Sequence, residues 1–237
     1  EVTVNMELAR SYQKALRNLS EKLCIKNDVT VSTLTRFPDV LATRHADVDE
    51  EQLWADVSAV TAQALDNFIA EHGLKPVMAV NTHGHFDHTL GVQFLKDTYG
   101  IPFALSGKDK FLLDNAAPGS SIFGVKVGAM PSIDLDLDTT DEVRFGHTAL
   151  KIIPTPGHTP GSVCLLCETV LFSGDTLFAG SYGRTDFLGG SSRDMAASLK
   201  RLSMLPPETR VLPGHGPSST IEEELRTNPY LRGHGIE

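Results

Sequence analysis

Three histidines and an aspartate fall within the six residues of the segment H-G-H-F-D-H, at His83, His85, Asp87 and His88. Imidazole nitrogens and carboxylate oxygens are ligands that zinc and iron accept in proteins. The segment directly follows an apolar run, residues 77–80, so these side chains would converge where a strand passes into a loop. Burying four such groups without a metal would leave several polar atoms desolvated, and the pattern therefore predicts a metal site.

Three later segments repeat the arrangement, each with an apolar run that leads to one ligand-type residue in a turn rich in glycine or proline. They are residues 152–161 with His158, residues 171–178 with Asp175, and residues 211–217 with His215. Glycine permits a tight turn that directs the ligand inward, and proline restricts the turn's conformation. Together with the first segment, these turns predict a preorganised metal cage.

Both α-helices and β-strands are predicted in the chain that positions these ligands. Two amphipathic helices are predicted near the amino terminus, within residues 8–23 and 53–68, from apolar residues spaced three and four apart. Beyond Gly73, short apolar runs alternate with turn residues, which is typical of strands. These runs are residues 77–80, 103–105, 150–153, 163–166 and 170–172.

Composition limits the classes of protein to which the chain can belong. Its 237 residues carry a formal net charge of −9 and are 41% hydrophobic, which excludes a disordered chain and a collagen. The acidic balance would repel a phosphate backbone, so we expect no nucleic-acid partner. No apolar stretch approaches the roughly 18 residues of a membrane span. We expect a cytoplasmic protein. Because the chain begins at Glu1, removal of a leader that preceded this residue stays an open alternative.

Two other patterns contain residue types that can bind metals, but both are typical of ordinary β-strands. Cys164 and Cys167 lie three apart on a predicted strand, so their side chains would face opposite ways and would hold neither a metal nor a redox couple. The alternating acidic and apolar residues of 133–138 predict a half-buried edge strand rather than a calcium site, because no EF-hand loop pattern is present.

The motifs resemble those of the metallo-β-lactamase-fold superfamily and, within it, of the glyoxalase II group of hydroxyacylglutathione hydrolases. The likeness spans about residues 71–231 and includes H-x-H-x-D-H, T-P-G-H-T-P-G-S, S-G-D-T-L-F and the final G-H-G. It implies an α+β fold, a four-layer αββα sandwich. Residues 1–73 show neither the β-hairpin nor the aspartate-proline-glycine turn usual in the group. We therefore predict one domain over residues 1–237, with a divergent, helix-rich region at 1–73 and a recognisable metal-binding core at 74–231.

The resemblance also implies roles for the ligands. His83, His85 and His158 would hold one divalent ion. A second ion would be held by Asp87, His88 and His215, and Asp175 would bridge the two ions. Zinc is the expected metal, and iron or manganese suits the same ligands. A water shared by two ions would be deprotonated near neutral pH and would attack a thioester carbonyl. We name Asp175 and Asp87 as catalytic residues, Asp87 being the nearest proton donor for a poor leaving group.

The expected partner is a small-molecule substrate, an anionic thioester; the oligomeric state stays open. Arg184 stands where glyoxalase II-like proteins often carry a basic residue that meets glutathione, but it could equally pair with Asp186; Tyr182 is a second substrate-binding candidate. Only 22 residues follow His215, too few for the helical domain that helps larger members to bind glutathione. The alternatives are a lactonase, a single-iron persulfide dioxygenase-like oxidoreductase, and a metal-stabilised binding protein without turnover. Asp175 argues against a true β-lactamase.

Overall fold

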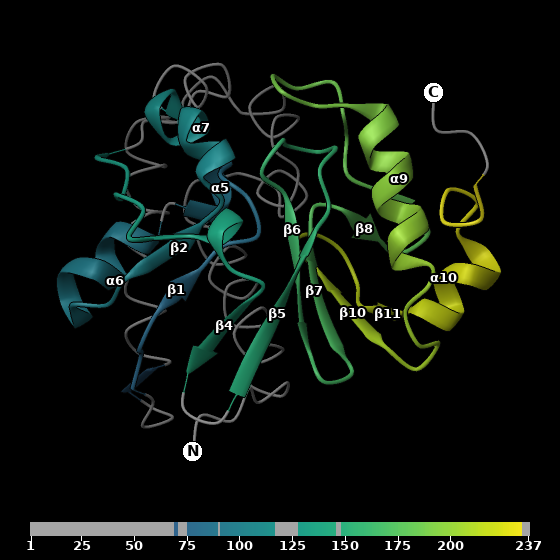
Figure 1. Cartoon of the computed structure of the whole chain (residues 1–237), viewed down its shortest axis with the longest axis horizontal. Helices are drawn as coiled ribbons and strands as arrows, with labels where there is room; N and C mark the ends of the chain where they lie inside the picture. Colours follow the sequence, from purple (N-terminus) through teal and green to yellow (C-terminus); the bar gives the residue numbers. More distant parts are fainter. Residues whose placement is uncertain (1–68, 71–74, 90, 117–127, 146–147, 234–237) are drawn as a thin grey trace, which may run out of the picture.

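The computed structural model describes residues 69–70, 75–89, 91–116, 128–145 and 148–233 (Figure 1). The two amino-terminal helices predicted within residues 8–23 and 53–68 lie outside these ranges. The third cysteine of the sequence, Cys24, also lies outside them. Among the described residues, no helix combines the length and apolar character needed to cross a membrane.

Two sheets form the centre of the described part of the chain. The smaller is parallel, in the order β1-β2-β3, and comprises β1 (Ala79–Val80), β2 (Phe103–Leu105) and β3 (Leu135–Asp136). The larger has the order β11-β10-β7-β6-β5-β4 and comprises β4 (Glu142–Phe145), β5 (Thr148–Pro154), β6 (Val163–Cys167), β7 (Val170–Gly174), β10 (Arg210–Pro213) and β11 (Ser219–Thr220). A separate hairpin pairs β8 (Leu177–Phe178) with β9 (Ser181–Tyr182).

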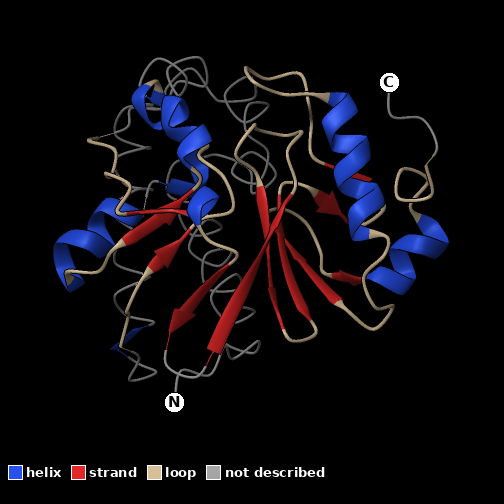
Figure 2. Cartoon of the chain, viewed as in Figure 1, coloured by secondary structure: helices blue, strands red, loops and turns tan. Residues whose placement is uncertain are grey.

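Helices flank the two sheets on their outer sides (Figure 2). On the side of the smaller sheet are α5 (Phe86–Thr89), α6 (Val92–Tyr99) and α7 (Lys110–Asp114), with the short 3-10 helices η1 (Gly107–Asp109) and η2 (Leu137–Thr139). On the side of the larger sheet are α9 (Ser192–Leu202) and α10 (Ile221–Thr227). The Ser191 side chain caps α9 by accepting a hydrogen bond from the backbone N–H of Asp194.

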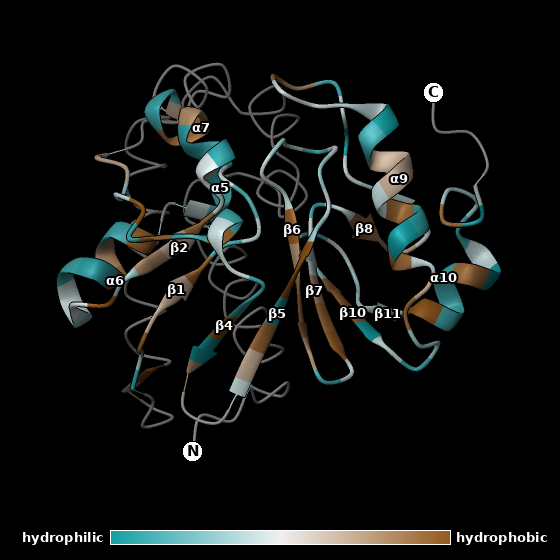
Figure 3. Cartoon of the chain, viewed as in Figure 1, coloured by the Kyte–Doolittle hydropathy of each residue, from teal (hydrophilic) through white to brown (hydrophobic). Residues whose placement is uncertain are grey.

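Three apolar clusters separate the layers. In β5 the adjacent residues Ile152 and Ile153 belong to different clusters, as strand alternation requires. Ile152 joins Ala104 of β2 in the cluster between the sheets, whereas Ile153 joins Leu199 of α9 in the cluster beneath the outer helices. The third cluster packs Phe103 of β2 with residues of α6 and α7. Figure 3 shows hydrophobic residues on the strands of both sheets, and helices that carry hydrophobic residues as well as hydrophilic ones. These three interfaces confirm a four-layer αββα sandwich.

The predicted edge strand at residues 133–138 is only partly confirmed. Strand pairing covers Leu135–Asp136, at the edge of the smaller sheet, and the chain then turns into η2. The acidic side chains explain the short strand, because Asp134 accepts hydrogen bonds from the backbone of Phe103 and from Lys96. Asp136 accepts one from the backbone of Gly107. The acidic side chains at 134 and 136 therefore accept hydrogen bonds from residues far away in the sequence, and the segment does not form one extended strand.

The two described cysteines face opposite sides of β6, as predicted. Cys164 is fully buried in the cluster beneath α9, and Cys167 packs against the cluster between the sheets. Each is a free thiol. They therefore form neither a shared metal site nor a redox pair.

The helix-facing core gives a first test. Leu199 of α9 is fully buried, so Leu199→Ala should lower the free energy of unfolding by about 2–5 kcal/mol through lost burial and a cavity. Met204 is 81% exposed, so Met204→Ala should change the free energy of unfolding by no more than about 0.5 kcal/mol. Urea unfolding followed by circular dichroism measures both. Equal changes in the two variants would contradict the assigned packing.

Candidate metal centre

The predicted ligands follow the carboxyl ends of four strands. Strands β6 and β7 are antiparallel, as are β5 and β6, so β5 and β7 run in the same direction, and β10 is parallel to β7. The chain therefore leaves β5, β7 and β10 at one edge of the larger sheet, where His158, Asp175 and His215 follow. His83 and His85 follow β1 of the smaller sheet.

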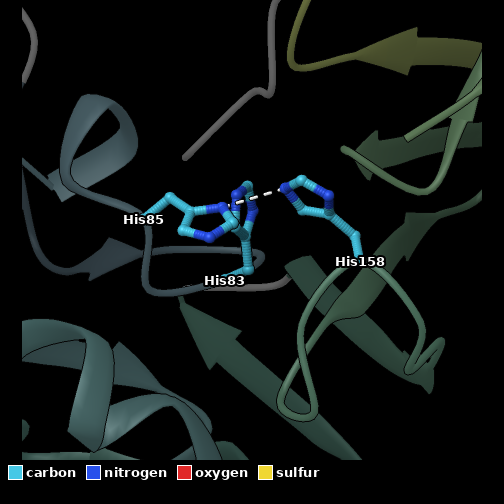
Figure 4. A group of neighbouring side chains, drawn as sticks. All are labelled: His83, His85 and His158. Atoms are coloured by element: carbon cyan, nitrogen blue, oxygen red, sulfur yellow. Dashed lines mark hydrogen bonds between the residues drawn. The ribbon is translucent and has the colours of Figure 1, made fainter. Parts of the chain in front are cut away.

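The structure brings the seven predicted ligands into three overlapping groups whose ligand atoms lie within 4.8 Å of one another. The groups are His83, His85 and His158; His83, His88 and Asp175; and Asp87, His88 and His215. In the first, His85 Nδ1 lies 2.9 Å from His158 Nε2, and the three rings converge on one point (Figure 4). Asp87 and His88 come from α5, directly after this loop.

A backbone hydrogen bond orients His158. Its Nδ1 donates to the carbonyl oxygen of Arg184 at 2.7 Å, because a carbonyl can only accept. This hydrogen bond selects the tautomer with the proton on Nδ1, in which the lone pair of Nε2 is directed at the other ligands. Such an outer hydrogen bond is the usual support of a metal-binding histidine.

Asp175 lies between the two outer groups. Its Oδ1 is 3.5 Å from His88 Nε2, and its Oδ2 is 3.5 Å from both His158 Nε2 and His215 Nε2. Asp87 Oδ2 is 3.3 Å from His215 Nε2 and 3.6 Å from His88 Nε2. Asp175 is thus the described carboxylate that faces histidines of both groups.

Several of these atoms are buried without a hydrogen-bond partner. Four buried side-chain polar atoms of the described residues lack one, and three of them are His83 Nε2, His88 Nε2 and Asp175 Oδ1. Leaving such atoms unsatisfied costs free energy, which coordination of a cation would recover. Nitrogen and carboxylate donors also match the preferences of zinc, iron and manganese, so the residues present fit a divalent metal.

The protonation states suit metal binding. Burial, and then the neighbouring His88, hold the pKa of His83 well below its usual value; burial and His158 lower that of His85 to about 4. Both rings are therefore neutral near pH 7. Burial alone would raise the pKa of Asp87, but His88 and the hydrogen bond with His215 hold it well below the usual range. That bond raises the pKa of His215 to about 8, so an ion binding there displaces a proton.

Glycines allow the ligand turns to approach one another. A Cβ on Gly214 would clash with Asp175 Oδ1 and lie 2.7 Å from His88 Cε1. Gly174, directly before Asp175, has a φ of +48° and leaves no room for a Cβ beside Thr82. The prediction that glycines permit the inward turns is confirmed at these two positions.

The predicted substrate residues have other contacts in the structure. The Arg184 guanidinium donates two hydrogen bonds of 2.6 Å to Asp186 and stacks over Phe187, 3.9 Å from the ring centroid. The predicted pairing with Asp186 is therefore confirmed. Tyr182 packs edge-on against Tyr230, with ring centroids 4.6 Å apart. Contact of Arg184 and Tyr182 with substrate stays a prediction.

Sequence reasoning missed two residues beside the centre. The ring of Phe187 lies edge-on to His85, with centroids 5.7 Å apart. Asp109 is fully buried and binds the loops that carry His83, His85 and His158. Asp109 stands between two lysines, a context typical of an exposed turn, so the sequence offered no signal for its burial.

Comparison with known proteins agrees with this geometry. A family model described as the metallo-beta-lactamase superfamily matches residues 58–215, which include all seven ligands. The chain belongs to the metallo-beta-lactamase superfamily. A second family model, the N-terminal region of YicC-like endoribonucleases, matches residues 1–72. The predicted single domain over 1–237 stays a prediction.

Relatives of this superfamily member include enzymes with assigned names. A probable metallo-hydrolase of Bacillus subtilis is 36% identical over 73% of this chain and 83% of its own length. A hydroxyacylglutathione hydrolase of Haemophilus influenzae is 32% identical over 72% of this chain and 82% of its own. Both names describe metal-dependent or hydrolytic enzymes, in agreement with a metal-dependent hydrolase.

Three solved structures share the fold of this superfamily member. The BLEG-1 B3 metallo-beta-lactamase has a TM-score of 0.69 and 39% identity, covering 73% of this chain and 85% of that one. TTHA1623 in a di-iron-bound form has a TM-score of 0.66 and 37% identity, covering 71% and 84%. ETHE1 from Myxococcus xanthus has a TM-score of 0.60 and 30% identity, covering 74% and 72%.

The packing of Gly214 against two ligands gives a second test. Gly214→Ala should displace Asp175 and His88 and thereby lower the metal bound per chain in elemental analysis. Gly128 has open space around its Cβ position, so Gly128→Ala is the matched control and should keep full metal content. Full metal content in Gly214→Ala would show that the centre tolerates a shift of this turn.

Proposed function

We propose that this metal-dependent hydrolase uses a two-ion centre to cleave an anionic thioester of the hydroxyacylglutathione type. The observation that carries the proposal is the position of Asp175, whose two oxygens face histidines of both outer groups at 3.5 Å. The names of relatives supply the substrate class, since hydroxyacylglutathione hydrolases of Haemophilus influenzae and Halorhodospira halophila are 32% and 29% identical to this chain.

Each residue of the centre would have a distinct role in binding the ions. His83, His85 and His158 would hold one divalent ion, and Asp87, His88 and His215 would hold the other. Asp175, which lies 3.5 Å from histidines of both groups, would help to hold both. When bound, the ions would supply an activated water at neutral pH and electrophilic activation of the substrate carbonyl. The Arg184 carbonyl keeps His158 Nε2 directed inward. A thioester suits such a centre, because its thiolate leaves without a strong general acid.

The described cysteines do not offer a competing nucleophile. Burial raises the pKa of Cys164 to about 11, and it also raises that of Cys167. A thiol with a raised pKa carries little thiolate at neutral pH, and the thiolate is the reactive form. Direct attack by water at the ligand cluster is therefore the simpler route.

Zinc is the metal we propose, and iron and manganese fit the same ligands. The second candidate is the single-iron persulfide dioxygenase-like oxidoreductase named in the sequence analysis. The observation that favours it is iron in a solved relative, because TTHA1623, at 37% identity, has a di-iron-bound form. Metal analysis of the purified protein, combined with assays on S-D-lactoylglutathione and on glutathione persulfide, separates the two. Two ions and thioester cleavage support the proposal. One iron with oxygen consumption on the persulfide would overturn it, as would cleavage of a β-lactam or a lactone in place of the thioester.

Removing the shared carboxylate tests the two-ion centre. Asp175→Ala should reduce thioester turnover by more than about 100-fold and lower the metal content, because it removes the carboxylate that lies 3.5 Å from histidines of both outer groups. Asp194 is an exposed acidic residue in the first turn of α9, and Asp194→Asn should retain wild-type turnover and metal. Steady-state kinetics and elemental analysis measure both variants. Wild-type turnover in Asp175→Ala would refute the assigned role.

Recognition of an anionic substrate is tested at Arg184. Arg184→Ala should raise KM for S-D-lactoylglutathione about threefold to tenfold and leave kcat unchanged, because an exposed ion pair contributes modestly and the backbone carbonyl that orients His158 is retained. An uncharged thioester should show no change. Arg193, an exposed arginine on α9, provides the control variant Arg193→Ala. An equal rise in KM for both substrates would contradict charge recognition by Arg184.

A further inference from the structure

A buried carboxylate lies behind the first group of ligands. Asp109, at the junction of η1 and α7, has no exposed surface. Its Oδ2 accepts hydrogen bonds from the backbone N–H of Gly84 at 2.9 Å and from the Thr159 hydroxyl at 2.6 Å. Its Oδ1 accepts one from the backbone N–H of Gly161 at 2.7 Å. One side chain thereby receives three hydrogen bonds from two loops.

Those two loops carry all three ligands of the first group. Gly84 stands between His83 and His85, and Thr159 directly follows His158. The contacts are close, because a Cβ on Gly84 would lie 2.9 Å from Asp109 Cβ, and one on Gly161 would lie 2.6 Å from Asp109 Oδ1. The position of the Asp109 carboxylate therefore sets the distance between the His83–His85 loop and the His158 turn.

Asp109 has no ionic partner among the described lysines and arginines. The lysines on either side of it point elsewhere, since Lys108 pairs with Asp138 and Lys110 pairs with Asp114. Burial raises the pKa of Asp109, while the Thr159 hydroxyl and the two backbone N–H groups act in the opposite direction. A buried carboxylate without a cation is a costly way to gain stability. A role in holding the ligand loops accounts for that cost.

We propose that Asp109 is a positioning residue that fixes the spacing of His83 and His85 relative to His158 and thereby sets the affinity of the ion held by these three histidines. The inference rests on the two-ion centre proposed above and adds a residue that touches neither ion nor substrate. Residues that hold metal ligands in place typically change metal affinity by about 10- to 100-fold when they are substituted.

The test is Asp109→Asn, which preserves shape. A carboxylate accepts on both oxygens, whereas an amide presents one acceptor and one donor group. One of the two backbone N–H groups, of Gly84 or of Gly161, would then face an NH2 group and lose its acceptor. Zinc titration of the metal-free protein against a chromophoric chelator should show ~10- to 100-fold weaker binding of one ion. Asp114→Asn, on the exposed side of α7, is the matched control and should bind as wild type does.

Two backgrounds identify which ion is affected. In His215→Ala the second group is incomplete, so the remaining ion reports on the first group, and adding Asp109→Asn should weaken it by the same factor. In His85→Ala the remaining ion reports on the second group, and adding Asp109→Asn should leave its affinity unchanged. A general loss of structure would weaken both ions. Equal weakening in the two backgrounds therefore overturns the inference.

A second variant covers the case in which Asp109→Asn does not fold, as judged by circular dichroism. Thr159→Val keeps the branched shape and removes one hydrogen bond to Asp109, so it should weaken the first ion about threefold to tenfold. Wild-type affinity in a folded Asp109→Asn or Thr159→Val variant overturns the positioning role. If the wild-type chain binds a single ion, the two-ion function fails, whereas the effect of Asp109→Asn on that ion still decides the role of Asp109.

Discussion

The rest of the structure depends on the convergence of histidine and aspartate side chains, three of whose inward atoms have no hydrogen-bond partner among the described residues. His83 Nε2, His88 Nε2 and Asp175 Oδ1 are buried and accept no hydrogen bond, a state that a folded protein tolerates only where a cation or a similar group compensates. His83 and Asp175 follow the ends of β1 and β7, and His88 lies in α5, directly after the loop that carries His83. The two sheets can therefore be understood as the framework that brings four strand ends to one place.

The turns satisfy a steric condition as well as an electrostatic one. Ligand atoms within 4.8 Å of one another require backbones that approach closely, and glycine at positions 174 and 214 makes that approach possible. Outer hydrogen bonds then orient the rings, as the Arg184 carbonyl does for His158. Metal binding and local backbone conformation are thus parts of one constraint, which explains why His158, Asp175 and His215 occur in turns rich in glycine or proline.

This coupling decides how much could be predicted from the sequence. The seven ligands were predicted because each lies in a local pattern, an apolar run followed by a turn, and local patterns are visible in one sequence. The partners of Asp109 are 25, 50 and 52 residues away, so no local pattern could indicate its burial. The strand predicted at 133–138 was too long for a similar reason, since Asp134 binds the distant Lys96 and Phe103. Residues 1–72 match a different family model, which agrees with the absence there of the β-hairpin and aspartate-proline-glycine turn usual in the glyoxalase II group.

The chemistry of the site and its specificity depend on different groups of atoms. The ligands determine which reactions the centre can support, and they occupy positions where a change of side chain disrupts the metal cage. The loop after β9 contributes differently, because Arg184 supports His158 through a backbone carbonyl that any residue would provide, while its side chain faces Asp186 and Phe187. A substitution at this position can therefore change the side chain that faces Asp186 and Phe187 without altering the orientation of the ligand His158. That separation is a physical reason why one fold can serve proteins that carry different names, among them a hydroxyacylglutathione hydrolase, a B3 metallo-beta-lactamase and ETHE1.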